Sequence, residues 1–350
     1  MNLQRLQKIT DKYRKLSIGV LGDFCLDRYL EIDPERTETS IETGLPVHNV
    51  VRVRAQPGGA GTILNNLVAL GVGQLVPLSF AGDDGEGFEL ARALRNLPGV
   101  CMDSFLQTPE RRTFTYCKPL LLDPNSQNPP RELNRLDSKN WTPTPADVED
   151  HLIASLRSWI DRIDALILME QVDTAETGSI TRRILDVVSQ LAAKRPELCI
   201  LADSRRSLRD YSSVILKMNR AELGVLLSGD PLSVGNPPPD IAATKVAAAE
   251  LARRHGRRVF VSLAEDGLLG ADPNGEVVHR KSFPLRGEID IVGAGDSVTA
   301  NLTAALAAGA SLAEAIEIAS AAASVVIHQL GTTGTASVAQ ISALLENESC

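Results

Sequence analysis

Short apolar runs alternate with helix-like segments along most of this chain. The apolar runs are rich in Val, Ile and Leu, which is typical of strands that are buried on both faces of a sheet. Strands are expected at residues 17–21, 75–80, 165–169, 198–202, 214–218 and 259–263, and helices at 62–70, 88–97, 180–194 and 242–255. This alternation predicts an α/β fold in which a mostly parallel central sheet carries helices on both faces.

Two segments, residues 27–56 and 105–137, depart from this alternation. They are rich in Thr, Val, Arg, Tyr and Pro, and their polar and apolar positions alternate with a period close to two. We expect them to form a small second sheet, inserted twice between elements of the main sheet. Such a sheet closes over a ligand as a lid or forms the contact of a homodimer. With this lid included, residues 1–350 are expected to form one domain.

The composition is that of an ordinary globular protein and narrows the classes of partner. The 350 residues include 36 Lys and Arg against 44 Asp and Glu, a net charge of −8 that argues against binding nucleic acid or anionic membranes. No apolar stretch approaches the roughly 18–20 residues that span a bilayer, and the polar start of the chain predicts no signal peptide. Five scattered cysteines without a CxxC pair suit a reducing cytoplasm and exclude a Cys-rich zinc module.

The most informative motif is Asp-Ile-Val-Gly-Ala-Gly-Asp-Ser at residues 290–297, which runs into an Ala-rich helix. Small residues at a helix start let a phosphate approach unpaired N–H groups. An acidic residue beside phosphate is explained if Asp296 removes the proton from an attacking hydroxyl. Gly293, Ala294 and Gly295 would then hold the transferred phosphoryl group. The alternative is that Asp296 only caps the helix, because Asp is a favoured N-cap.

Polar residues follow several of the predicted strands. In open α/β sheets, ligands bind beyond the carboxyl ends of the strands. A helix cap or a turn would account for any one of these residues alone, but their repetition favours a shared cleft. The residues are Asp23, Asp27, Glu170, Asp203 and Asn219.

A second glycine-rich turn, residues 56–62, opens a helix without the spacing of a dinucleotide-binding motif. Gly58 and Gly59 would allow a polyhydroxylated ligand to lie against bare backbone. A simple tight turn into a helix is the alternative.

Asn219 and Glu222 place an amide and a carboxylate three residues apart. Mg²⁺ keeps most of its water and needs few protein oxygens, so this pair suits a magnesium ion held through water. The same spacing is also that of a capping box, in which the two residues only cap a helix.

In this order and at these separations, the motifs Gly58-Gly59, Asn219-x-x-Glu222 and 290–296 resemble those of the PfkB/ribokinase family of carbohydrate kinases. The resemblance extends over residues 17–345 and implies a ribokinase-like three-layer sandwich with a small β-sheet lid. Within the family, the chain is most similar to the heptose-7-phosphate kinase domain of bifunctional ADP-heptose synthesis proteins. The residues that carry this likeness are Gly22-Asp23, 26–29, 57–60, Asn66, 69–71, 135–137 and 328–332.

The resemblance implies an ATP- and Mg²⁺-dependent kinase in which Asp296 is the base and residues 293–295 are the anion hole. The implied nucleotide-side residues are Asn219, Glu222, Ser262, Gly267 and Arg205, with Asn219 and Glu222 near the metal. The implied acceptor-side residues are Asp27, Gly58, Gly59, Thr62 and Glu170. Many family members also bind K⁺, for which Asp290 and Ile291 are the nearest candidates here.

Three departures from the family pattern lie on the acceptor side. Thr62 stands where the family commonly has Asn, Glu170-Gln171 stands where heptose kinases have Asp-Tyr, and a Pro-rich loop precedes Arg135. The acceptor is therefore a sugar or sugar phosphate by resemblance, with a nucleoside or another small alcohol as an alternative. An inactive ligand-sensing protein on the same fold is a third reading.

Three basic residues of the lid segment, Arg111, Arg112 and Lys118, offer a clamp for an acceptor that already carries a phosphate. The alternative is that they only form a solvated face of the lid.

Overall fold

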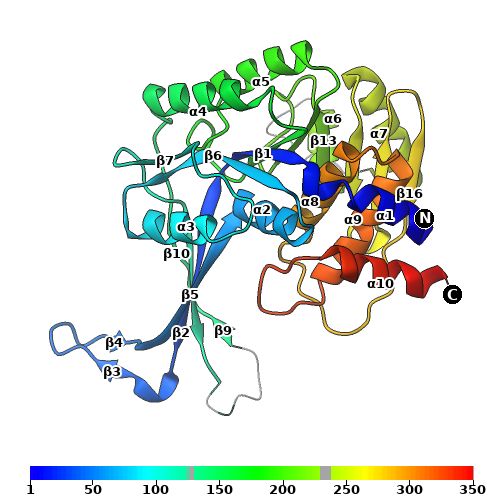
Figure 1. Cartoon of the computed structure of the whole chain (residues 1–350). Coiled ribbons are helices and arrows are strands. Elements are labelled where there is room, and N and C mark those ends of the chain that lie inside the picture. Colours follow the sequence, from blue (N-terminus) through cyan, green and yellow to red (C-terminus); the bar gives the residue numbers. More distant parts are fainter. Residues whose placement is uncertain (124, 126–129, 229–237, 350) are drawn as a thin grey trace.

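The computed structural model describes residues 1–123, 125, 130–228 and 238–349, and within them a nine-stranded sheet forms the centre (Figure 1). Its order is β16-β15-β14-β13-β12-β11-β1-β6-β7, with every pair from β14 to β7 parallel and the pairs β14–β15 and β15–β16 antiparallel. The predicted α/β fold with a mostly parallel sheet is confirmed. The strands are β1 (Ser17–Gly22), β6 (Gln74–Gly82), β7 (Phe105–Thr108), β11 (Ala165–Glu170), β12 (Cys199–Ser204), β13 (Ile215–Asn219), β14 (Val259–Ser262), β15 (Leu268–Ala271) and β16 (Val277–Arg280).

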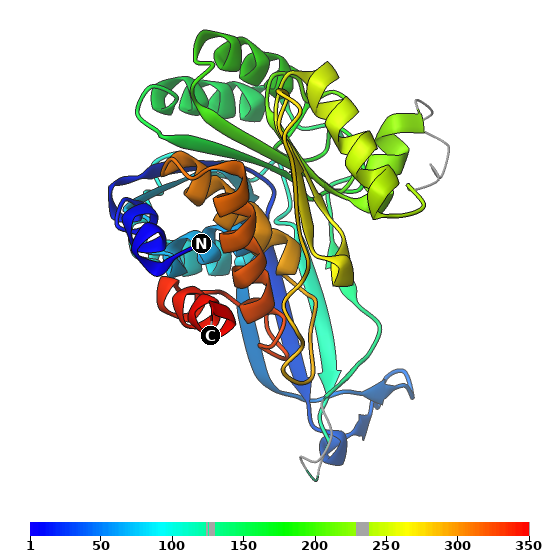
Figure 2. The ribbon, with the colours of Figure 1, turned by 90° about the vertical axis from the view of Figure 1, so that its right-hand side faces the viewer.

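Helices cover both faces of the sheet, which makes the body a three-layer sandwich (Figures 1 and 2). On one face lie α1 (Leu3–Thr10), α2 (Ala60–Ala69), α3 (Gly85–Arg95), α8 (Ala294–Ala307), α9 (Leu312–Val326) and α10 (Val338–Ser349). On the other lie α4 (Ala146–Trp159), α5 (Arg182–Lys194), α6 (Arg220–Ser228) and α7 (Ile241–His255). Short 3₁₀ turns occupy 13–15, 34–36 and 264–266. No helix in the described ranges combines the length and the apolar content that crossing a bilayer requires.

The alternation of side chains along the strands divides the core into two layers. In β11, every residue is buried, and Ile167 and Met169 belong to the cluster under α8, whereas Leu166 and Leu168 belong to the cluster under α4 and α5. Successive side chains of a strand point to opposite faces of the sheet. The last residue of each strand therefore reaches only one of the two helical layers.

The lid is a second sheet that extends away from the body in Figure 1. Its order is β10-β8-β2-β5, with β9 paired to β8. The strands are β2 (Phe24–Ile32), β5 (Val50–Gly59), β8 (Thr115–Leu121), β9 (Arg131–Glu132) and β10 (Leu136–Ser138), and β3 (Glu38–Thr39) pairs with β4 (Pro46–Val47) between β2 and β5 along the chain. The sequence thus predicts the existence of the lid and its two insertions correctly. Residues 124 and 126–129 of the second insertion lie outside the described residues.

The lower bound expected for the second lid segment is wrong. Residues 105–108 form β7, which pairs in parallel with β6 at the edge of the main sheet. The helix α3 connects these two strands, and such a crossover returns the chain to the same sheet. The lid strand of this segment begins only at Thr115.

Candidate active site

The start of helix α8 offers free backbone donors. Gly293 is its N-cap and adopts φ +84°, a left-handed conformation that glycine accepts without strain. Asp296 is half-buried in the first turn. The N–H groups of Gly295 and Asp296 have no hydrogen-bond partner among the described residues. Together with the positive end of the helix dipole, these N–H groups favour an anion at this point.

A buried ion pair lies against this helix start. The ammonium of Lys217 in β13 donates to Asp203 Oδ2 of β12 over 2.7 Å, and the hydroxyl of Thr299 in α8 donates to the same oxygen over 2.8 Å. A Cβ placed on Gly295 would lie 3.3 Å from Lys217 Nζ. The two charges are therefore held between the central strands and the first turns of α8.

The surroundings raise the pKa of Asp296 to about 7. Burial is the main cause, and the negative charge of Asp203 acts in the same direction, whereas Lys217 and Arg205 act against it. A carboxyl group with this pKa changes its protonation state near neutral pH, as a general base requires.

Asp27, Gly58 and Gly59, which the sequence predicts to bind the acceptor, lie together at the junction of lid and body. Asp27 is buried on β2, and Lys118 of β8 places its Nζ 4.0 Å from Asp27 Oδ1. A Cβ on Gly58 would lie 2.6 Å from Asp27 Oδ2, and Gly59 adopts φ +59° with its Cβ position 2.6 Å from the backbone oxygen of Asp23. Side chains at both positions would displace Asp27 or the chain beneath it.

The negative charge of Asp27 also contributes to the raised pKa of Asp296, so the two carboxyl groups lie close enough for their charges to interact. Burial raises the pKa of Asp27 itself, opposed by Lys118, Arg135 and Arg205. Thr62 is buried in the first turn of α2, next to the glycine turn.

Asn219 and Glu222 form a reciprocal cap at the start of α6. The backbone N–H of Asn219 donates to Glu222 Oε2 over 2.7 Å, and the N–H of Glu222 donates to Asn219 Oδ1 over 2.9 Å. This is the capping-box geometry that the spacing also predicted. Glu222 keeps a second carboxylate oxygen outside these two bonds. No group of three or more His, Cys, Asp or Glu residues suited to a metal occurs within the described ranges.

The other residues expected to bind nucleotide lie at the ends of neighbouring strands. Ser262 ends β14 and donates to the backbone oxygen of Met218 over 3.3 Å. Gly267 follows with φ +95°, and a Cβ there would lie 2.0 Å from the oxygen of Arg280, so the turn into β15 requires glycine. Arg205 is exposed just beyond β12. Burial raises the pKa of Glu222 and of Asp296, and the positive charge of Arg205 opposes this rise.

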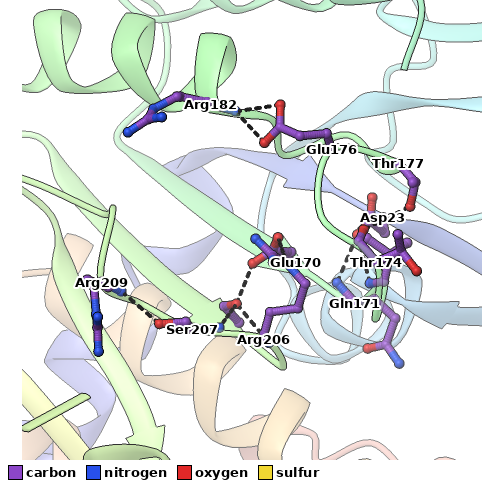
Figure 3. A network of polar contacts seen from close by, with 12 residues as sticks. Asp23, Glu170, Gln171, Thr174, Glu176, Thr177, Arg182, Arg206, Ser207 and Arg209 are labelled. Atoms are coloured by element: carbon purple, nitrogen blue, oxygen red, sulfur yellow. Dashed lines mark hydrogen bonds and ion pairs between the residues drawn. The ribbon is translucent and has the colours of Figure 1, made fainter. Parts of the chain in front are cut away.

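The side chain of Glu170 is directed toward Arg206, as Figure 3 shows. Its carboxylate accepts hydrogen bonds from Ser204, from Arg206 Nε (2.8 Å) and from the hydroxyl of Tyr211 (3.1 Å). In the sheet register, Glu170 lies beside Ser204, whereas Met169 lies beside Asp203. Glu170 and Asp203 therefore project from opposite faces of the sheet.

Asp23 is a structural carboxylate rather than an exposed cleft residue (Figure 3). Its two oxygens accept hydrogen bonds from the backbone N–H groups of Gln171 (2.8 Å), Val172 (3.2 Å) and Ser179 (2.6 Å). It thereby fixes the segment that follows β11. Burial nevertheless raises its pKa to about 6.

Two of the three basic residues considered for a phosphate clamp are used elsewhere. Arg111 is buried, and its guanidinium donates to the backbone oxygens of Thr142 (3.0 Å), Pro143 (3.2 Å) and Thr177 (2.8 Å). Arg112 lies 3.8 Å from Asp84. Only Lys118, beside Asp27, lies at the cleft.

The residues nearest to an expected potassium site are engaged in the backbone of the same turn. Asp290 accepts from the N–H groups of Val292 (3.0 Å) and Gly331 (3.3 Å), and the backbone oxygen of Ile291 accepts from Ala294 (3.2 Å). These bonds shape the loop that leads to Gly293.

Lys217 and Thr299 are the residues of this site that sequence reasoning missed. The available signal was a lysine within the apolar run Ile-Leu-Lys-Met at 215–218, where a charge is unexpected unless it is paired. Thr299 gave no comparable signal, because a threonine in an Ala-rich helix is common.

Comparison with known families shows to which family this chain belongs. The model of the pfkB family carbohydrate kinases matches residues 24–339. The chain belongs to this family. The family assignment made from the sequence motifs is confirmed for this pfkB chain.

Among curated relatives, the chain is similar to the bifunctional protein HldE of Trichlorobacter lovleyi, with 30% identity over 99% of this chain and 66% of that protein. It is similar to HldE of Rhodospirillum rubrum with 29% identity over 98% of this chain and 65% of that protein. The pfkB chain thus spans slightly less than two thirds of the length of these relatives.

Solved structures agree on the fold. Ribokinase of Arabidopsis thaliana in complex with ribose and ATP has a TM-score of 0.67 at 19% identity, covering 95% of this chain and 99% of that chain. The tetrameric inhibited form of phosphofructokinase-2 from Escherichia coli has a TM-score of 0.70 at 19% identity, covering 96% and 100%. The ribokinase-like three-layer fold is therefore confirmed.

Proposed function

We propose that this chain is an ATP-dependent kinase that transfers the γ-phosphoryl group of ATP to a hydroxyl of a sugar or sugar phosphate. The observation that supports this proposal most directly is the position of Asp296. A carboxyl group with a pKa of about 7 lies next to the free N–H groups at the start of α8. A proton acceptor and an anion-binding helix start are the two parts that phosphoryl transfer to an alcohol requires.

In the proposed reaction, Asp296 takes the proton of the acceptor hydroxyl as its oxygen attacks the γ-phosphorus. A new O–P bond forms, the bond from the γ-phosphorus to the β–γ bridging oxygen breaks, and ADP leaves with those electrons. The N–H groups of Gly295 and Asp296, with Gly293 and Ala294 beside them, receive the charge on the transferred group. Arg205 adds a positive charge on the side of the nucleotide phosphates.

The acceptor lies between the lid and the body in this proposal. Asp27 orients its hydroxyl groups, and Gly58 and Gly59 let it approach the backbone. Lys118 and Arg205 provide cations for a phosphate already present on the acceptor, which fits the sequence resemblance to heptose-7-phosphate kinases. Thr62 closes the inner end of this space.

Glu170 has a supporting role instead of a contact with the acceptor. Its side chain binds Ser204 and Arg206, and its backbone oxygen accepts from the N–H of Arg205 over 3.0 Å. Glu170 thereby fixes the segment that carries Arg205 to the cleft.

Magnesium would accompany the nucleotide phosphates, where it neutralises charge on the β- and γ-oxygens. The donor set fits a mostly hydrated ion, since Asn219 Oδ1 and Glu222 Oε2 are used in the cap and only Glu222 Oε1 remains. We assign Glu222 to this ion through water, beside Ser262 and Gly267 on the nucleotide side.

A homodimer formed through the lid is part of the proposal. Val53 and Leu136 are exposed on one face of the lid sheet, 47% and 65% respectively, in rows that also contain Leu30 and Cys117. The charge in these rows is that of Arg28, which is paired with Glu86. An apolar face of this kind is stabilised when a second copy covers it.

ATP-dependent chemistry on a small sugar also fits the cytoplasmic location expected from the sequence.

The decisive experiment is ATP turnover by the purified chain with Mg²⁺ against free sugars, sugar phosphates including heptose 7-phosphate, and nucleosides. We expect acceptor-dependent release of ADP with a sugar phosphate, and the same assay with Na⁺ in place of K⁺ tests a potassium requirement. Absence of ATP binding would refute the kinase proposal. Turnover with nucleosides alone would show that the acceptor is a nucleoside and not a sugar or sugar phosphate.

A further inference from the structure

Lys217 is a buried cation with donors to spare. Only 7% of its side chain is exposed, and among the described residues its ammonium has one hydrogen-bond partner, Asp203 Oδ2 at 2.7 Å. An ammonium group has three N–H donors. Burying such donors without partners is unfavourable, so a ligand that accepts from them would be stabilised.

The unpaired donors lie at the anion-binding end of α8. Nζ is 3.3 Å from the position that a Cβ on Gly295 would occupy, and the missing side chain at 295 is what leaves room for the ammonium. The free N–H groups of Gly295 and Asp296 belong to the same turn. A phosphoryl oxygen that approaches these N–H groups therefore comes close to the ammonium as well.

The ion pair keeps Lys217 charged and fixed. Burial alone would lower the pKa of the ammonium, but the contact with Asp203 and the charges of Asp296 and Glu222 outweigh it and raise that pKa. Thr299 donates to the same Asp203 oxygen over 2.8 Å, so the carboxylate is held from α8 as well as from β13. Such a fixed charge needs no reorganisation when negative charge develops beside it.

We propose that Lys217 is a further catalytic residue of the phosphoryl-transfer reaction, and that its free N–H groups donate to the γ-phosphoryl oxygens as the group moves to the acceptor. This inference rests on the proposed kinase function. The competing role is a purely structural one, in which Lys217 only neutralises Asp203.

Two variants separate these roles. Lys217→Met removes the cation, and we expect kcat to fall about 10²–10³-fold, the usual loss for one transition-state donor. Asp203→Asn combined with Lys217→Met removes both charges and leaves no lone buried carboxylate. If Lys217 only neutralises Asp203, the double variant regains wild-type kcat, which would overturn the inference. If Lys217 acts on the phosphoryl group, the double variant stays slow.

Binding gives a readout independent of turnover. By calorimetry, we expect Lys217→Met to weaken Mg²⁺·AMP-PNP about 10-fold and to leave Mg²⁺·ADP within about twofold, because only the former carries a γ-phosphoryl group. Equal affinity changes for the two nucleotides would contradict the proposed contact. The matched control is Lys12→Met, whose Nζ donates to the oxygen of Ala308 over 2.6 Å at the opposite end of α8. This control should leave turnover and nucleotide binding unchanged.

The outcomes also distinguish failure of the role of Lys217 from failure of the proposed kinase function. A wild-type chain that neither binds ATP nor turns over an acceptor refutes the kinase function. A wild-type chain that is active, together with a Lys217→Met variant of equal activity, refutes only the role of Lys217.

Discussion

Gln56 of the lid donates a hydrogen bond of 2.6 Å from its side-chain amide to the hydroxyl of Thr333. Gln56 lies opposite Asp27 in the pairing of β5 with β2, and Thr333 lies 3.4 Å, at its Cβ, from the Cβ position of Gly293. The hydroxyl of Thr332 also donates to Gln56 Oε1 over 3.4 Å, so two hydrogen bonds connect the proposed acceptor side to the loop beside the proposed anion hole. The lid strands are held at a fixed place relative to α8 by these contacts.

Gln56→Ala should therefore weaken the use of the acceptor. Because the variant loses the hydrogen bonds to Thr332 and Thr333, we expect kcat/KM for the acceptor to fall about 3–10-fold, with little change in nucleotide affinity. Steady-state kinetics with each substrate varied in turn measure this. Asn49→Ala is the control, because among the described residues the Asn49 amide donates to Arg36 and Glu38, both within the lid. Equal losses in both variants would mean that the lid is loosened in general.

The pH dependence of turnover should follow Asp296. A general base acts only when it is deprotonated, so kcat/KM should fall tenfold per unit as the pH drops below about 7, the pKa raised by burial. Asp296→Asn should lower kcat about 10²–10⁴-fold and remove this acid limb. A variant with wild-type turnover, or a wild-type profile that is flat from pH 5 to 8, would exclude Asp296 as the base.

Asp296 should also lower the stability of the folded chain at high pH. Its pKa is about 7 in the folded chain and about 4 in an unfolded one, so the folded state binds more protons between these values. The free energy of unfolding therefore falls as the pH rises from 4 to 7. Asp296→Asn should raise this free energy on the order of 2 kcal/mol at pH 8 and less at pH 5. Denaturant unfolding at the two pH values measures it, with the exposed Asp161→Asn as a control that should change neither.

The sequence predicts the positions of strand ends better than the directions of their side chains. Asp203 and Glu170 both end central strands, and sequence reasoning placed both in one cleft. In the sheet register, however, Glu170 lies beside Ser204, one residue out of phase with Asp203. Because side chains alternate with period two, a shift of a single residue moves a side chain to the other face. Local sequence does not define that phase at the last residue of a strand.

Contacts between segments that are distant in the sequence could not be predicted from it either. The glycine-rich motif at 293–295 identified the helix start from local conformation alone, since small residues and an Ala-rich run suffice to predict it. The partner of that helix start, Lys217, comes from β13, which pairs between β12 and β14. Only the strand order brings Lys217 under Gly295, and strand order is a property of the whole chain.

Gly58 should tolerate no side chain. A Cβ there would lie 2.6 Å from Asp27 Oδ2, so Gly58→Ala must push the carboxylate out of its place. We expect KM for the acceptor to rise about tenfold or more while the affinity for Mg²⁺·ADP is retained. Gly85→Ala is the matched control, because no atom lies within 4 Å of its Cβ position. Unchanged acceptor kinetics in Gly58→Ala would exclude Asp27 from acceptor binding.

The apolar face of the lid should control the oligomeric state. We expect the wild-type chain to sediment at twice the mass of one chain, and Val53→Lys with Leu136→Lys to sediment as a monomer. Charges on this face would have to be buried without partners in the dimer, which is unfavourable by several kcal/mol. Val246→Lys, on an apolar residue of α7 that is more exposed than either lid residue, should leave the dimer intact. A wild-type chain that is monomeric at micromolar concentration would exclude the lid dimer, and a dimer that survives both lid substitutions would place its interface elsewhere.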